Sequence, residues 1–126
     1  MFRLMLDAHP DLVCPGEADF LTDHLVKSPQ GEWRYDLDAL SRDRIFQASR
    51  ARMPDTDEAM AAFRQMTADL LGDDRGTLVI VAHRGLDRLL DLCRSLSVLH
   101  IVRDPRDVAR SAVGMGWAGN VFYGVD

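Results

Sequence analysis

The spacing of apolar residues predicts that the first half of the chain is mainly helical. Apolar side chains recur every three or four positions, as in helices with one buried face, over residues 1–8, 18–26, 37–50 and 55–71. The last stretch has the clearest ends, because Asp55 and Glu58 form a capping-box pattern and Gly72 is a typical C-cap residue. Between these stretches, the Pro-Gly pair within residues 14–16 predicts a turn and residues 27–33 predict a loop.

The pattern changes in the second half of the chain. Residues 77–82 and 97–102 are short runs rich in β-branched apolar side chains, and a helical pattern over residues 86–94 separates them. Strands that are apolar on both faces are typical of parallel sheets covered by helices. We therefore expect an α/β fold, with a small parallel sheet flanked by helices, in a single domain over residues 1–126.

Composition and charge narrow the classes of partner. The chain has 126 residues, of which 47% are hydrophobic, enough for one buried core. Its formal net charge of −5 argues against nucleic acid or an anionic membrane as a partner. No apolar run exceeds five residues, whereas a membrane helix needs about 20, so we expect a cytoplasmic protein.

A candidate anion site follows the second predicted strand. Asp104 is a suitable N-cap, Pro105 fits the first helical position, and Asp107 favours the first turn of a helix. Arg103 would then lie at the carboxyl edge of the sheet, where ligands of open α/β sheets bind, and Ser111 would follow along the helix. These two side chains can share one phosphate group. The alternative is an exposed ion pair between Arg103 and Asp104 or Asp107, with Ser111 as an ordinary surface residue.

Two segments resemble one enzyme family. RDPRDVARS, residues 103–111, resembles the 3′-phosphate-binding motif of sulfotransferases that use 3′-phosphoadenosine-5′-phosphosulfate (PAPS). LDAHPDLVCPGE, residues 6–17, resembles the segment that follows the sulfate-handling loop in tyrosylprotein and bacterial sulfotransferases. The resemblance implies a partial P-loop-like three-layer fold and transfer of a sulfuryl group from PAPS, without a metal, to a hydroxyl or amine of a small molecule or peptide. It also implies that Arg103 and Ser111 bind the 3′-phosphate.

The chain departs from the family pattern at both ends. The Pro-x-x-Gly-Thr-Thr loop that holds the phosphosulfate in the family would precede Met1, and a later segment that contacts the 3′-phosphate would follow Asp126. We therefore expect a fragment that holds the 3′-phosphate-binding part of the enzyme.

Sulfuryl transfer needs a general base for the acceptor hydroxyl, and two residues are candidates. Glu17 resembles the catalytic glutamate of tyrosylprotein sulfotransferases, and its alternative role is to begin the next helix. His83 resembles the histidine of a Lys-Thr-His run in cytosolic sulfotransferases, with Arg84 as a substitute for the missing lysine near the leaving phosphate. Its alternative role is a strand-end histidine without chemistry.

Two other functions stay open from the sequence. One is a relative of P-loop nucleotide kinases, which would need a phosphate-binding loop upstream and an acidic metal ligand at a strand end. The other is a non-catalytic nucleotide-binding or interaction remnant, which would hide its open sheet edge in a homo-oligomer. The glycine-rich, aromatic residues 114–120 suit a loop that lines a substrate or adenine pocket.

Overall fold

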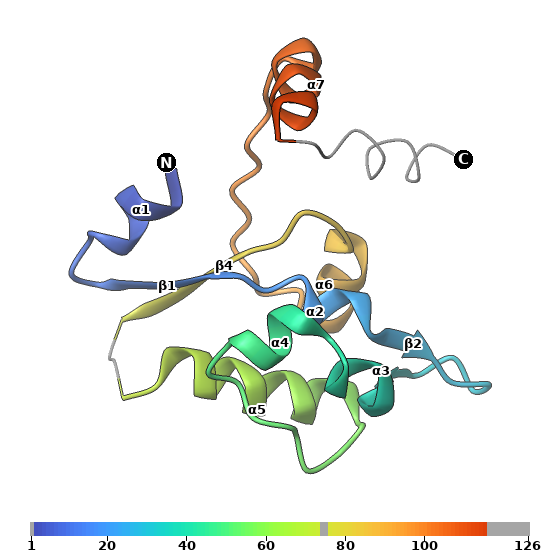
Figure 1. Cartoon of the computed structure of the whole chain (residues 1–126). Helices are drawn as coiled ribbons and strands as arrows, with labels where there is room; N and C mark the ends of the chain where they lie inside the picture. Colours follow the sequence, from blue (N-terminus) through green and yellow to red (C-terminus); the bar gives the residue numbers. More distant parts are fainter. Residues whose placement is uncertain (1, 74–75, 116–126) are drawn as a thin grey trace. The chain divides into compact units, whose positions relative to one another are not determined.

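The computed structural model of the chain describes residues 2–73 and 76–115 (Figure 1). The chain divides into two compact units, Met1–Leu96 and Ser97–Asp126, and each is described by itself.

The first unit contains a two-stranded parallel sheet. Strand β1 (Leu12–Glu17) pairs with β4 (Thr77–Val81), and the register places Leu12 opposite Thr77 and Glu17 opposite Val81 (Figure 1). The strand predicted over residues 77–82 is therefore confirmed. The turn predicted at residues 14–16 is wrong, because these residues lie within β1.

Strand β1 tolerates its Pro-Gly pair because the pairing is irregular there. The register shifts between Val13 and Gly16, so Pro15 lies where a regular ladder hydrogen bond is not required. Gly16 has a φ of 118°, which a residue with a side chain rarely adopts. A proline-glycine pair in a sequence thus indicates either a turn or a bulged strand, and here it forms the bulge.

The strand predicted over residues 97–102 is also wrong, since this segment has no regular secondary structure. Its apolar side chains are exposed, with Leu99 at 69% and Val102 at 80% of their full surface. Strand preference reflects pairing and packing against neighbours more than the backbone itself. Among the described residues, the sheet partner of β4 is β1.

Short helices and a hairpin complete the first unit. The helices are α1 (Phe2–Asp7), α2 (Phe20–Asp23), α3 (Leu37–Ser41), α4 (Arg44–Ala48), α5 (Ala59–Leu71) and α6 (Leu86–Leu92), and β2 (Leu25–Lys27) pairs antiparallel with β3 (Trp33–Tyr35). Helix α1 packs beside β1, and α5 contacts both strands of the parallel sheet from its other side (Figure 1). The α/β class and the small parallel sheet flanked by helices are therefore confirmed.

Several helix boundaries differ from the sequence prediction. Within residues 18–26, only Phe20–Asp23 form a helix, and Leu25–Lys27 form strand β2. Residues 37–50 form two helices, because the Asp43 carboxylate accepts hydrogen bonds from the N–H groups of Ile45 and Phe46 and begins α4. Helix α5 begins later than Asp55, because Glu58 caps it with both carboxylate oxygens. Gly72 ends α5 as expected, with a φ of 67°.

The core of the first unit lies mainly between α2, the hairpin and α5. Aromatic rings contribute to it, since Phe20 and Phe46 meet edge to face with centroids 5.4 Å apart. The buried members of this cluster are Ala18, Phe20, Leu21, Leu25, Tyr35, Leu40, Phe46, Ala59, Ala62, Phe63, Met66, Leu70 and Leu89. The Tyr35 hydroxyl donates to the Leu21 carbonyl at 2.8 Å, and burial raises the pKa of this phenol.

The second unit contains helix α7 (Pro105–Gly114). Its start agrees with the sequence prediction, because Asp104 is the N-cap, its carboxylate accepts from the Arg106 N–H at 2.9 Å, and Pro105 opens the helix. Residues 116–120 of the predicted pocket-lining loop lie outside the described residues.

The helices of residues 2–73 and 76–115 include none with the length and apolar content required to cross a bilayer.

Asp43 has two structural roles, as the cap of α4 and as the partner of His24. Besides capping α4, its carboxylate lies 2.7 Å from His24 Nε2, and both side chains are largely buried. Burial acts to raise the pKa of Asp43, but hydrogen bonds from Phe46, His24 and Ile45 outweigh it and lower that pKa.

We predict that Asp43→Ala lowers the free energy of unfolding by about 2–3 kcal/mol, because a cap and a charged hydrogen bond are lost together. Asp36→Ala, which removes a single exposed cap of α3, should cost about 1 kcal/mol. Urea unfolding near neutral pH measures both. Because the folded pKa of Asp43 is lowered, its contribution is complete above pH ~4 and is lost as the pH falls through the folded value. Equal losses in the two variants would contradict the dual role.

Candidate active site

The candidate site lies at the carboxyl ends of the two parallel strands. Glu17 ends β1 opposite Val81, and the Ala18 N–H donates to the Val81 carbonyl at 2.9 Å, which extends the pairing by one bond. His83 follows β4 by two residues. The two candidate bases therefore follow neighbouring strands at one edge of the sheet, where ligands of open α/β sheets commonly bind.

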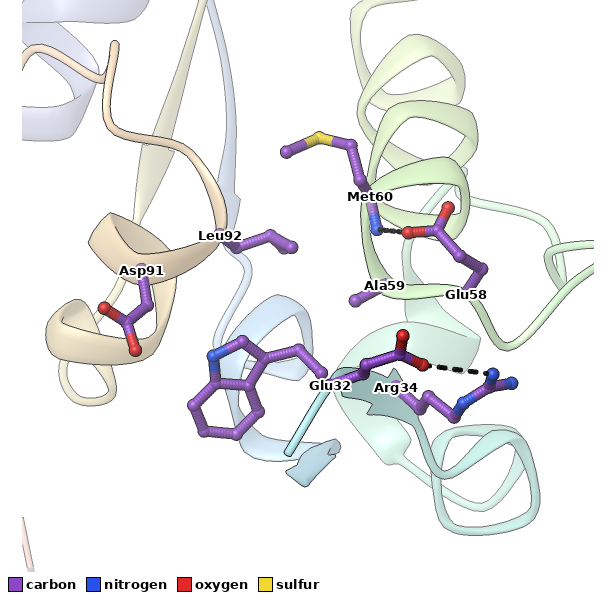
Figure 2. Close-up of a pocket in the computed structure, with 8 residues that line it drawn as sticks. Glu32, Arg34, Glu58, Ala59, Met60, Asp91 and Leu92 are labelled. Carbon is purple, nitrogen blue, oxygen red and sulfur yellow. Dashed lines mark hydrogen bonds and ion pairs between the residues drawn. The ribbon is translucent and has the colours of Figure 1, made fainter. Parts of the chain in front are cut away.

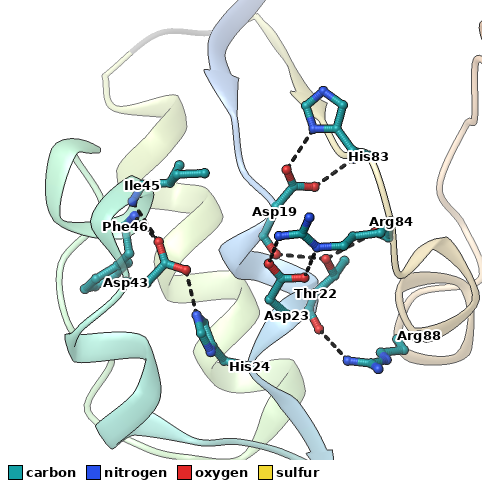
Figure 3. A network of polar contacts seen from close by, with 10 residues as sticks. All are labelled: Asp19, Thr22, Asp23, His24, Asp43, Ile45, Phe46, His83, Arg84 and Arg88. Atoms are coloured by element: carbon teal, nitrogen blue, oxygen red, sulfur yellow. Dashed lines mark hydrogen bonds and ion pairs between the residues drawn. The ribbon is translucent and has the colours of Figure 1, made fainter. Parts of the chain in front are cut away.

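Asp19 and His83 form a close pair at this edge (Figure 3). The His83 main-chain N–H donates to Asp19 Oδ1 at 2.7 Å, and His83 Nδ1 lies 2.8 Å from Asp19 Oδ2. The Asp19 side chain is 5% exposed, whereas the His83 side chain is 55% exposed. The carboxylate is thus a buried anchor, and the imidazole extends from it towards solvent.

The surroundings of Asp19 satisfy the polar groups that are buried with it. Asp19 and Thr22 are the two buried polar residues within the described part of the chain. The Thr22 hydroxyl contacts the Asp19 carbonyl at 2.8 Å and the Arg84 carbonyl at 3.2 Å. Arg88 donates to the Thr22 carbonyl at 3.2 Å (Figure 3). Hydrogen bonds between α2 and the segment after β4 therefore offset the cost of burying these groups.

Arg84 has a carboxylate partner in this network. Its guanidinium binds Asp23 in a bidentate pair, with Nε to Oδ1 at 2.7 Å and Nη2 to Oδ2 at 2.6 Å. These hydrogen bonds raise the pKa of Arg84 above its usual range. Arg84 therefore holds the segment after β4 against α2, and its charge is paired with that of the Asp23 carboxylate.

Glu17 is exposed and makes no side-chain hydrogen bond or ion pair with another described residue. It lies at the end of β1 rather than at the start of a helix, since Asp19 is the residue that precedes α2.

Arg103 and Ser111 belong to the second unit. Arg103 is exposed and lies just before the cap of α7, and Ser111 is half-buried within that helix. The prediction that Arg103 lies at the carboxyl edge of a sheet is wrong, because residues 97–102 form no strand. The Asp104 carboxylate binds Arg106 rather than Arg103, with Oδ2 2.7 Å from Arg106 Nη2. Within the described residues of the second unit, no carboxylate forms an ion pair with Arg103.

Two pockets of the first unit lie away from these residues. One, of about 310 Å³, is lined by Glu32, Trp33, Arg34, Glu58, Ala59, Met60, Asp91 and Leu92 (Figure 2). Its Glu58 carboxylate caps α5, and Glu32 lies 3.6 Å from Arg34. The other, of about 480 Å³, lies at the amino ends of the parallel strands. Neither is lined by Glu17 or His83.

No family model, curated protein or solved structure matches this chain. The likeness to sulfotransferases therefore rests on the two sequence segments.

Asp19 is the site residue that the sequence does not reveal. It falls two positions after Glu17, inside a stretch that predicts a helix, and its contact with His83 joins residues 64 positions apart. An aspartate at such a position is most often an exposed helix cap. Its burial depends on the pairing of β1 with β4, which the sequence pattern did not predict.

Gly85 lies close to the Thr22 side chain, so a side chain at residue 85 should lower the stability of the site. Gly85 has a φ of 71°, and a Cβ there would lie 2.6 Å from the Thr22 Cβ. We expect Gly85→Ala to lower the free energy of unfolding by about 2–4 kcal/mol, because an unfavourable backbone conformation and an overlap are combined. Gly31→Ala is the matched control, with a φ of 85° and open space around the new methyl group.

The control should cost about 1–2 kcal/mol, the backbone contribution alone. Denaturant unfolding of both variants measures the difference. Two equal losses would show that the loop after β4 is not held against α2.

Proposed function

We propose that this chain is the 3′-phosphate-binding part of a PAPS-dependent sulfotransferase with a partial P-loop-like three-layer fold. The acceptor would be a hydroxyl or amine of a small molecule or peptide.

The observation that carries this proposal is the pairing of charges at the start of α7. Arg106 occupies the Asp104 carboxylate, and Asp107 forms no ion pair with Arg103 within the described residues. Of the two alternatives for Arg103, an ion pair or an anion site, the anion site therefore has the better support. The family resemblance of residues 103–111 supplies the identity of the anion, a 3′-phosphate.

Arg103 and Ser111 are the residues that would hold the 3′-phosphate. A guanidinium can donate two parallel hydrogen bonds to phosphate oxygens, and a serine hydroxyl can donate a third. The N-terminus of α7 adds a favourable helix dipole on the same unit as both residues.

His83 is the better supported of the two candidate bases. Its imidazole is exposed at the carboxyl edge of the sheet and is oriented by a buried carboxylate, an arrangement that suits proton transfer. Glu17 lies at the end of the neighbouring strand and is exposed, so it remains the second candidate.

The proposed reaction moves a sulfuryl group. When bound, PAPS supplies the sulfur atom that the acceptor oxygen or nitrogen bonds, as the S–O bond to the 5′-phosphate breaks and adenosine 3′,5′-bisphosphate leaves with the electron pair. Within the first unit, His83 would take the proton of the acceptor group.

The alternative of a nucleotide kinase relative has less support. Such an enzyme needs an acidic metal ligand at a strand end. Asp19 is the carboxylate that follows β1 most closely in a buried position, and both of its oxygens already accept hydrogen bonds from His83.

Binding of adenosine 3′,5′-bisphosphate to the whole chain tests the proposal. We expect Arg103→Gln to weaken binding about 10- to 100-fold, because charged hydrogen bonds to the phosphate are lost, and Ser111→Ala to weaken it about 3- to 10-fold. Isothermal titration calorimetry measures each dissociation constant.

Arg110→Gln is the matched control, since Arg110 is an exposed arginine of the same helix. It should stay within about twofold of the wild type. Equal affinity for adenosine 5′-monophosphate, or equal losses in the Arg103 and Arg110 variants, would contradict a 3′-phosphate site. Absence of any nucleotide binding would favour the alternative of a non-catalytic interaction remnant.

A further inference from the structure

The contact between Asp19 and His83 consists of two hydrogen bonds, which together orient the histidine. Each carboxylate oxygen faces a different nitrogen of the same residue, Oδ1 the main-chain N–H at 2.7 Å and Oδ2 the ring Nδ1 at 2.8 Å. The two contacts fix both the position of the histidine and the rotation of its ring (Figure 3).

The chemistry of the two groups decides where the ring proton lies. An ionised carboxylate accepts hydrogen bonds and cannot donate them, and a neutral imidazole carries one N–H. A short contact between Asp19 Oδ2 and Nδ1 therefore requires the proton on Nδ1. The lone pair of the neutral ring is then on Nε2, to which no described residue is hydrogen-bonded, and the side chain is 55% exposed.

We propose that Asp19 is a positioning residue, which holds His83 in the Nδ1–H tautomer and so makes Nε2 the atom that accepts a proton from the acceptor group. This inference rests on the proposed function for the role of Nε2, whereas the tautomer itself follows from the contact.

The surrounding network makes the arrangement rigid. The Ala18 N–H is bonded to Val81, which fixes β1 against β4 immediately before Asp19. On the other side, the bidentate pair of Arg84 with Asp23 fixes the residue after His83. Main-chain and ionic contacts of the neighbouring residues thus support the Asp19–His83 pair on both sides.

Nitrogen NMR of the whole chain with ¹⁵N-labelled histidine tests this inference. At about pH 8, where an unperturbed imidazole is neutral, long-range proton–nitrogen correlations show which ring nitrogen carries the hydrogen. The chain has four histidines, and the signals of His83 are those lost in His83→Gln. We expect the His83 pattern to be that of the Nδ1–H tautomer.

Asp19→Asn should reverse this pattern. The new amide oxygen keeps the contact with the His83 main-chain N–H, so the amide NH₂ faces Nδ1 and donates to it. The ring proton then moves to Nε2, and the nitrogen pattern shifts to the other tautomer. A role of Asp19 that is only structural would leave the ring pattern of the folded variant unchanged.

Asp43→Asn is the matched control, because it makes the same change in the other aspartate–histidine pair, that of His24. It should leave the His83 signals in place. An Nε2–H pattern in the wild type, or an unchanged pattern in Asp19→Asn, would overturn the inference, and the wild-type spectrum is sufficient to do so if the variant does not fold. Nucleotide binding does not enter this measurement, so a correct tautomer without nucleotide binding would remove the proposed function alone.

Discussion

The interaction on which the first unit most depends is the pair of hydrogen bonds between His83 and the buried Asp19 carboxylate, at the end of the parallel sheet. A buried carboxylate is costly unless hydrogen bonds replace its water. His83 supplies two of them, one from its main chain and one from its ring. The pair therefore joins the end of β4 to the start of α2, and the same contact that stabilises this edge of the sheet orients an exposed imidazole.

The sequence predicts the elements that carry strong local signals. The strand over residues 77–82, the end of α5 at Gly72 and the start of α7 at Asp104 and Pro105 all follow from side-chain chemistry within a few residues. The wrong predictions concern pairing between segments that are far apart in the sequence. Whether a Pro-Gly pair turns the chain or bulges a strand depends on a partner strand far away in the sequence, and residues 97–102 lack such a partner among the described residues.

The residues of the candidate site likewise divide into those that local sequence signals reveal and those that they do not. Glu17 and His83 could be chosen from their types and positions, and the structure brings the strands that carry them together. Asp19 could not, because its burial and its contact arise from the pairing of segments 64 residues apart. Arg84 illustrates the converse, since its charge suits a phosphate but a bidentate aspartate occupies it. At the start of α7, the Asp104 carboxylate binds Arg106 rather than Arg103.

Hydrogen exchange at the His83 main-chain amide tests most directly whether Asp19 holds the end of β4. This amide should exchange at least about tenfold more slowly than that of Arg84, the next residue, because it donates to a buried carboxylate oxygen at 2.7 Å. Exchange of the His83 amide at the rate of an unprotected peptide, in a chain whose α5 amides are protected, would contradict the account.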